Sequence, residues 1–223
     1  HGVSTDHRTR DGASALIWAT EKGRTDAVRL LLEKGADINL QKNDGTTALI
    51  IAAQTGNIEI TRLLLEKGAS TDLQKNDGFT ALMFASGSGF NDIVTLLLDK
   101  GANPDLKNLR GETALIIAIQ NGQVETSRLL LEKNADPNVQ INDGISALIL
   151  AILKGDNDIV KLLLEKGAQP DIMPFNGFTA LMYASINGTT ETVRLLLENG
   201  AKADFKAPNG YTALMMAALN GHA

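Results

Sequence analysis

The sequence predicts an all-α solenoid built from helix-turn-helix units of 33 residues that are joined by β-hairpin loops. Three recurring features lead to this prediction. A Leu-Leu-Leu run recurs with a period of 33 residues at 30–32, 63–65, 96–98, 129–131, 162–164 and 195–197. An Ala-Leu pair recurs with the same period, beginning at Ala15, Ala48, Ala81, Ala114, Ala147, Ala180 and Ala213. A turn glycine precedes each pair, at Gly12, Gly45, Gly78, Gly111, Gly144, Gly177 and Gly210. Such a period, uninterrupted by insertions, is typical of stacked repeat arrays.

The unit at residues 42–74 shows why a hairpin and a first helix are expected. Asn43-Asp44-Gly45 is a turn signal, because Asn and Gly tolerate the positive φ of a tight hairpin turn. Thr47 follows and can cap a short apolar helix over residues 48–55. Gly56 is suited to end that helix in the left-handed conformation. Every unit has Ser or Thr at the capping position: Ser14, Thr47, Thr80, Thr113, Ser146, Thr179 and Thr212.

A second helix is expected over residues 57–67, because apolar and polar side chains alternate there with the helical period. Gly68 closes this helix, and in one unit its place is taken by Asn134, another residue that tolerates left-handed backbone. Proline would break a helix interior. All five prolines fall in the connecting loops, at Pro104, Pro137, Pro170, Pro174 and Pro208.

We expect one repeat domain over residues 1–223, with six full repeats from about 9 to 206 and a partial repeat at 207–223. Residues 1–8 are expected to be the tail of a preceding repeat, because Gly2-Val3-Ser4-Thr5-Asp6 aligns with Gly68-Ala69-Ser70-Thr71-Asp72. Neither end resembles the polar capping repeat that a stacked array needs. The sequence is therefore expected to be a piece of a longer array.

The composition narrows the class of protein. Lys and Arg number 21 against 26 Asp and Glu, which gives a net charge of -5, and cysteine is absent. Without cysteine there is no disulfide scaffold, Cys-based zinc site or thiol nucleophile. The acidic balance argues against nucleic-acid binding, and no apolar run approaches the roughly 20 residues that span a bilayer. We expect an intracellular, cytoplasmic location, with no nucleic-acid partner and no membrane insertion.

No constellation of reactive residues is visible. The three histidines, His1, His7 and His222, lie near the ends of the sequence, with no Ser or Asp in repeat phase to form a catalytic set. The Asn-Asp-Gly turns lack the oxygen ladder and terminal Glu of a calcium loop. No glycine-rich phosphate loop occurs. The sequence thus predicts neither catalytic residues, nor a metal site, nor a cofactor, and the chain is not expected to be an enzyme.

The repeated unit resembles the ankyrin repeat. The resemblance rests on Asp44-Gly45-Thr46-Thr47-Ala48-Leu49, on the Leu-Leu-Leu run and on Gly35-Ala36-Asp37-Ile38-Asn39. Tetratricopeptide repeats have a period of 34 and lack the hairpin signal, so they fit less well. The family's Pro is Ala in every copy. Its His is Ile or Met, and we expect apolar packing in place of the hydrogen bonds of that His, at Ile17, Ile50, Met83, Ile116, Ile149, Met182 and Met215.

The resemblance implies a concave binding surface made of the hairpin tips and the exposed side of each first helix. Seven of the nine aromatic residues fall on these phases, all except Phe90 and Phe205. Aromatic side chains are frequent anchors of protein interfaces, and apolar residues accumulate on these phases in the fifth to seventh repeats. The predicted partner-binding residues are Trp18, Phe79, Phe84, Ile145, Leu153, Phe175, Phe178, Tyr183, Ile186, Tyr211 and Leu219.

Two readings of this surface stay open at the sequence level. In the first, the chain is a non-catalytic interaction scaffold that binds a partner protein or peptide there; alternatively, it is the recognition arm of a larger enzyme, channel or signalling protein. In the second, Phe178 and Tyr211 stack on neighbouring repeats, while Tyr183 and Met216 are shared packing, so that no accessible patch exists. Met215, Met216 and Leu219 are expected to lack a covering helix, which predicts weak self-association at the C-terminal end.

Overall fold

The computed structural model describes residues 5–222, and the first four residues of the predicted tail and Ala223 lie outside the described residues. Within them the chain forms thirteen α-helices and no strand. They belong to two compact units, one reaching to Leu109 and the other beginning at Arg110. The all-α repeat architecture is as predicted.

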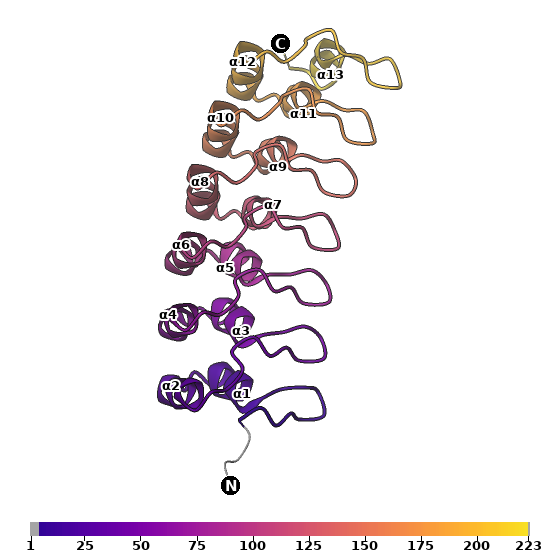
Figure 1. The fold of residues 1–223 in the computed structure, drawn as a ribbon. Coiled ribbons are helices and arrows are strands. Elements are labelled where there is room, and N and C mark those ends of the chain that lie inside the picture. Colours follow the sequence, from indigo (N-terminus) through magenta and orange to yellow (C-terminus); the bar gives the residue numbers. More distant parts are fainter. Residues whose placement is uncertain (1–4, 223) are drawn as a thin grey trace. The chain divides into compact units, whose positions relative to one another are not determined.

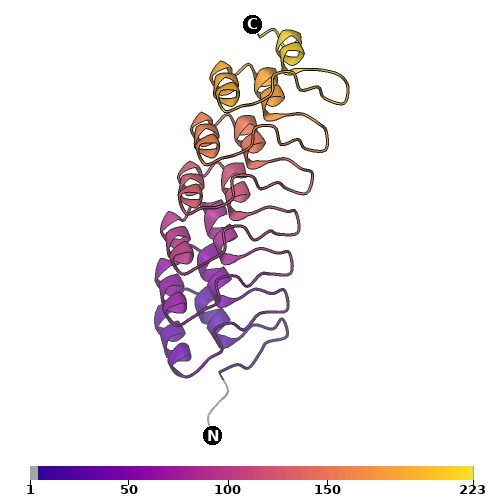
Figure 2. The same cartoon turned by 45° about the horizontal axis from the view of Figure 1, so that its top comes forward.

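The helices of the first unit form three pairs, and these pairs can be followed in Figure 1. The first helices of the pairs pack side by side, and the second helices form a second row next to them (Figure 2). The first helices are α1 (Ala15–Glu21), α3 (Ala48–Gln54) and α5 (Ala81–Ser88). The second helices are α2 (Thr25–Glu33), α4 (Ile58–Glu66) and α6 (Asn91–Asp99).

The second unit repeats this arrangement with three pairs and one further first helix. Its first helices, which again pack in sequence order, are α7 (Ala114–Gln120), α9 (Ala147–Lys154), α11 (Ala180–Asn187) and α13 (Ala213–Leu219). Its second helices are α8 (Val124–Glu132), α10 (Asn157–Glu165) and α12 (Thr190–Glu198). In both units the hairpin loops project from the side of the first helices (Figure 1).

The capping prediction is confirmed at all seven first helices. Thr47 Oγ1, for example, accepts a hydrogen bond from the Ile50 N–H at 3.1 Å, which satisfies one of the free donors at the start of α3. The equivalent Ser or Thr caps α1, α5, α7, α9, α11 and α13. Asn134 adopts φ 64° and is the one residue other than glycine with positive φ in the described chain. Each unit of sequence therefore sets its own helix boundaries.

Neighbouring repeats are joined by a ladder of side-chain acceptors. The amide oxygen of Asn39 accepts the backbone N–H of Ser70 at 2.8 Å, and that of Asn138 accepts the N–H of Gln169 at 2.8 Å. The carboxylates of Asp6, Asp72 and Asp171 occupy the equivalent position, and each accepts a backbone N–H from the following repeat. Every one of these bonds spans 31 residues, so this position links neighbouring repeats within each unit.

The hairpins close as turns. The Lys42 N–H donates to the Thr46 carbonyl at 2.9 Å, and the Asn43 N–H donates to the Asp11 carbonyl of the preceding hairpin at 3.0 Å. In the described residues an isolated bridge between Gln140 and Ser146 is the nearest approach to a strand pair. Over the same residues no helix has the length and apolar character needed to cross a membrane.

Candidate protein-binding surface

The predicted binding residues lie on two kinds of element. The hairpins carry Phe79, Ile145, Phe175, Phe178 and Tyr211, and the first helices carry Trp18, Phe84, Leu153, Tyr183, Ile186 and Leu219. None of these eleven side chains is buried. Trp18, Leu153, Phe175, Tyr211 and Leu219 are exposed, and the other six are half-buried.

A tight row of side chains connects hairpin and helix in the second unit. The rings of Phe178 and Tyr183 are 6.0 Å apart at an angle of 51°, which is within the range of a favourable aromatic contact. The Tyr183 hydroxyl accepts a hydrogen bond from Asn176 Nδ2 at 2.7 Å. Ile186 lies three residues further along α11, on the same face of the helix. These contacts place hairpin and helix side chains of one repeat on a common surface.

The first unit contains the equivalent pair. Phe79 and Phe84 have ring centroids 5.1 Å apart, and the ammonium of Lys75 lies 5.7 Å from the Phe84 ring centroid. Trp18 is similarly approached by the ammonium of Lys22 at 5.8 Å. Such contacts have favourable cation–π geometry, and they place a positive charge beside Trp18 and beside Phe84.

The hairpins of the first unit also form an ionic network. The Lys42 ammonium lies 2.9 Å from the Asp11 carboxylate. The Thr9 hydroxyl hydrogen bond and then this lysine lower the pKa of Asp11 to about 2. The Asp11 hydrogen bond likewise raises the pKa of Lys42. Asp11 and Lys42 are therefore held charged on the hairpins of the first unit.

Asp44 belongs to the same network. Burial raises its pKa, but hydrogen bonds from the Thr46 N–H and hydroxyl, at 3.0 and 2.8 Å, together with nearby lysines, lower it further than burial raises it. The Lys75 ammonium reaches Asp44 at 3.8 Å and Asp77 at 3.7 Å. These ion pairs thus link neighbouring hairpins, and the charged groups that form them already have partners.

The second unit presents a different surface at the same positions. Phe175, at a hairpin tip, is 84% exposed. The hairpin positions of the fifth to seventh repeats are Ile145, Phe178 and Tyr211. Two positions on the first helices of these repeats are also uncharged. One is occupied by Leu150, Tyr183 and Met216, and the other by Leu153, Ile186 and Leu219. We call these nine residues the apolar grid. All nine are uncharged, and only Met216 is buried.

The apolar grid stops at the fourth repeat. There the hairpin position is Glu112, which is buried and whose carboxylate is 2.8 Å from the Arg110 guanidinium. The outer helix position is Gln120. In the first unit the outer helix position is Glu21, Gln54 or Gly87. The continuous apolar surface is therefore confined to the fifth to seventh repeats.

Two apolar residues that are not buried were not predicted as binding residues although the repeat period marks them. Leu109 is 72% exposed and occupies the same hairpin-tip position as Phe175. Leu150 is half-buried and occupies the same helix position as Tyr183. Both lie on phases that the prediction used elsewhere, so following every apolar residue through those phases in all repeats finds them.

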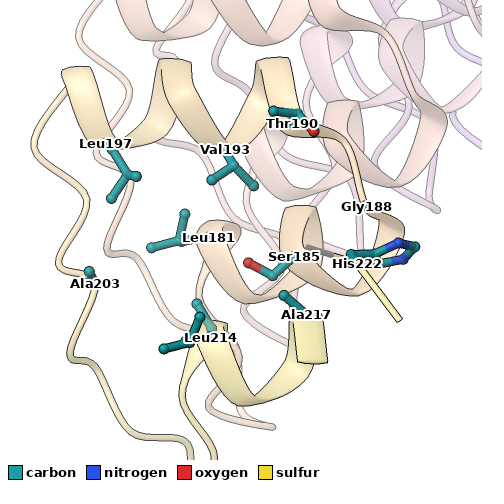
Figure 3. Close-up of a pocket in the computed structure, with 11 residues that line it drawn as sticks. Leu181, Ser185, Gly188, Thr190, Val193, Leu197, Ala203, Leu214, Ala217 and His222 are labelled. Carbon is teal, nitrogen blue, oxygen red and sulfur yellow. The ribbon is translucent and has the colours of Figure 1, made fainter. Parts of the chain in front are cut away.

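The C-terminal end of the second unit contains an apolar groove of about 410 Å³. Leu181 and Leu214 point into it from α11 and α13, and Val193 and Leu197 point into it from α12 (Figure 3). His222 lies against Gly188 at one end, where its ring nitrogen Nε2 is 3.0 Å from the Ile186 carbonyl. Leu214 is 78% exposed. Apart from Ser185, Thr190 and His222, the side chains that line this groove are aliphatic.

No group of His, Asp or Glu side chains in residues 5–222 is arranged to hold a metal ion. Many exposed positions of the hairpins and first helices are occupied by apolar side chains. Such a surface can bind by burial of apolar area.

The family model for ankyrin repeats in three copies matches residues 16–108, 102–174 and 148–223. The chain belongs to the ankyrin repeat family. The family accounts for the period, the capped first helices and the hairpins described above. A search of curated protein sequences finds no match to this chain.

Solved ankyrin repeat domains resemble the chain along most of its length. The domain of Bcl-3, described as a unique member of the IkappaB protein family, is 32% identical, with a TM-score of 0.82 over 93% of this chain and 95% of that one. A domain from Acinetobacter baumannii AYE is 33% identical, with a TM-score of 0.79 over 84% and 98%. The domain of human ASB11 is 29% identical, with a TM-score of 0.75 over 92% of each chain.

Ankyrin repeat domains are typically used for protein–protein interaction and are usually non-catalytic. This ankyrin chain has the expected apolar replacement of the family histidine. Ile17, Ile50, Met83, Ile116, Ile149 and Met182 are all buried, whereas Met215 is exposed. Apolar packing at six of these positions thus fills the interior of the repeats.

Proposed function

We propose that this ankyrin repeat domain is a non-catalytic scaffold that binds a partner protein or peptide on its hairpins and first helices. The observation that carries the proposal is the apolar grid, with Phe175 beside it at a hairpin tip. Monomeric proteins rarely expose a contiguous apolar surface without a binding role. Phe178 and Tyr183 form the centre of this site, and Ile145, Leu153, Ile186, Tyr211 and Leu219 extend it. Trp18, Phe79 and Phe84 offer further contacts on the first unit.

The polar hairpins of the first unit have a different role in this proposal. Their charges are paired with one another, so they contribute orientation more than binding energy, because exposed ion pairs add little free energy. The apolar positions of the fifth to seventh repeats supply the binding energy, since buried aromatic anchors dominate most interfaces. The same site serves equally if the domain is the recognition arm of a larger enzyme, channel or signalling protein.

The test uses peptides selected for binding to the full chain from a random displayed library. A Phe178→Ala/Tyr183→Ala double variant is expected to bind the selected peptides about 30-fold or more weakly than the unchanged chain, because both anchors are lost. Leu30→Ala is the matched control, since Leu30 is exposed on a second helix and lies outside the proposed site. Fluorescence titration gives the affinities, and circular dichroism checks the fold.

Phe175→Ala keeps the test decisive if the double variant unfolds, because the Phe175 side chain is almost fully exposed and its removal should not affect folding. If peptides bind both variants as tightly as the unchanged chain, the proposed site is wrong.

We also infer weak self-association through the C-terminal groove. The groove is lined by Leu181, Val193, Leu197 and Leu214, and Met215 and Leu219 are exposed on α13 next to it. Two copies that place these aliphatic side chains against each other would remove them from water.

A further inference from the structure

We propose that the partner segment bound by the apolar grid is an amphipathic α-helix with apolar residues in a heptad pattern, lying across α9, α11 and α13. The inference rests on the proposed function and names the kind of partner. It follows from three properties of the grid: its spacing, its width and its lack of charge.

The spacing comes from the repeat. Positions Leu153, Ile186 and Leu219 are equivalent residues on three first helices that pack side by side. Packed helices lie about 8–10 Å apart, so equivalent side chains recur along the surface at about that interval. Seven residues of α-helix rise about 10.5 Å. A helix that crosses the three helices therefore brings every seventh residue opposite an equivalent position.

The width favours a helix over an extended segment. Every third residue of an extended chain would also recur at about 10 Å. However, the fifth and sixth repeats each present a row of three side chains, such as Phe178, Tyr183 and Ile186, which spans a hairpin and a helix. A helix about 10 Å in diameter, with an apolar stripe at least 100° wide, covers such a row. A single strand directs only alternate side chains, in one line, towards a surface.

The lack of charge defines the contacting face. None of the nine positions of the grid is charged, and the nearest charged residues along the sequence, Asp143 and Lys154, are exposed. Burying an unpaired charge against the grid would carry a large desolvation cost. The face of the partner helix that touches the grid is therefore apolar, with intervals of three and four residues between its anchors.

The experiment compares three synthetic peptides of about 18 residues. The first has leucines at alternating intervals of three and four, with Glu, Lys, Gln and Ala elsewhere. The second has the same composition with the leucines scrambled. The third has the heptad leucines but two interior prolines, which prevent a helix. Each is labelled with fluorescein and titrated with the full chain, and bound helix is followed by circular dichroism.

We expect the heptad peptide to bind at least tenfold tighter than the other two and to gain helicity on binding. Ile186→Glu and Leu153→Glu should each lower the affinity for the heptad peptide tenfold or more. Gln54→Glu is the matched control, because Gln54 occupies the same repeat position in the first unit, and this change should leave the affinity unaltered.

Equal binding of the heptad and scrambled peptides, or no effect of either glutamate variant, would overturn the inference. If the proline peptide binds most tightly and loses its affinity in Ile186→Glu, the partner is extended; the helix is then wrong while the proposed function stands. If the peptides selected from the library bind the Phe178→Ala/Tyr183→Ala variant as tightly as the unchanged chain, the proposed function is wrong, whether or not the heptad peptide binds.

Discussion

Asn134 shows how one residue can replace a glycine at the end of a helix. It adopts φ 64° where every other repeat in the described chain has glycine. Asn tolerates this conformation because its short polar side chain can hydrogen-bond locally, whereas Cβ-bearing residues of other types meet a steric penalty. The sequence alone identified this position, since only Gly and Asn fill it.

Replacing Asn134 with Ala is expected to lower the free energy of unfolding by about 1 kcal/mol, because Ala is strained at positive φ. Asn134→Gly should be neutral or slightly stabilising. Urea unfolding followed by circular dichroism measures both. The control is Glu132→Ala, an exposed position at the end of α8 with right-handed backbone. Equal unfolding midpoints for Asn134→Ala and the control would contradict the prediction.

The connection between neighbouring helix pairs depends on the acceptor ladder. Asn138 accepts the Gln169 N–H at 2.8 Å, and its Nδ2 donates to the Gly167 carbonyl at 3.2 Å. The sequence shows Asn or Asp at this position in every repeat, but its partner is 31 residues away. Only packing of one pair on the next brings the side chain to that N–H, so the contact could not be read from the period.

We expect Asn138→Ala to destabilise the chain by about 1 kcal/mol, because it leaves the Gln169 N–H without its acceptor. Asn138→Asp should lose less, since it keeps an acceptor oxygen and Asp occupies this position at Asp72 and Asp171. Thermal unfolding of the two variants beside the unchanged chain measures the difference. An Asp variant as unstable as the Ala variant would show that the acceptor bond contributes nothing.

At the scale of the whole molecule, the exposed apolar groups at the C-terminal end should drive weak association. We expect the sedimentation coefficient to rise with protein concentration, because association buries the groove lined by Leu181, Val193 and Leu197. Leu214→Gln should suppress this rise. Leu109→Gln is the matched control, since Leu109 is about equally exposed but lies on a hairpin of the first unit. A concentration-independent monomer would exclude the association.

The repeat period predicted which positions form the candidate site, but it did not predict how exposed each side chain is. The repeat phases placed all eleven predicted residues on hairpins and first helices. The same helix position, however, is exposed as Trp18, half-buried as Tyr183 and buried as Ile51 or Met216. The period fixes only the backbone site. Exposure depends also on side-chain volume and on what the adjacent repeats place beside it.

The sequence by itself determined the period, the helix caps, the left-handed positions and the aliphatic interior of each repeat. These follow from local backbone preferences and from the helical spacing of apolar residues, which act within one unit. Tertiary structure alone decided that Phe178 and Tyr183 form one accessible row and that Glu112 is buried against Arg110. Those outcomes depend on contacts between elements, because a side chain's accessibility is set by its neighbours in space.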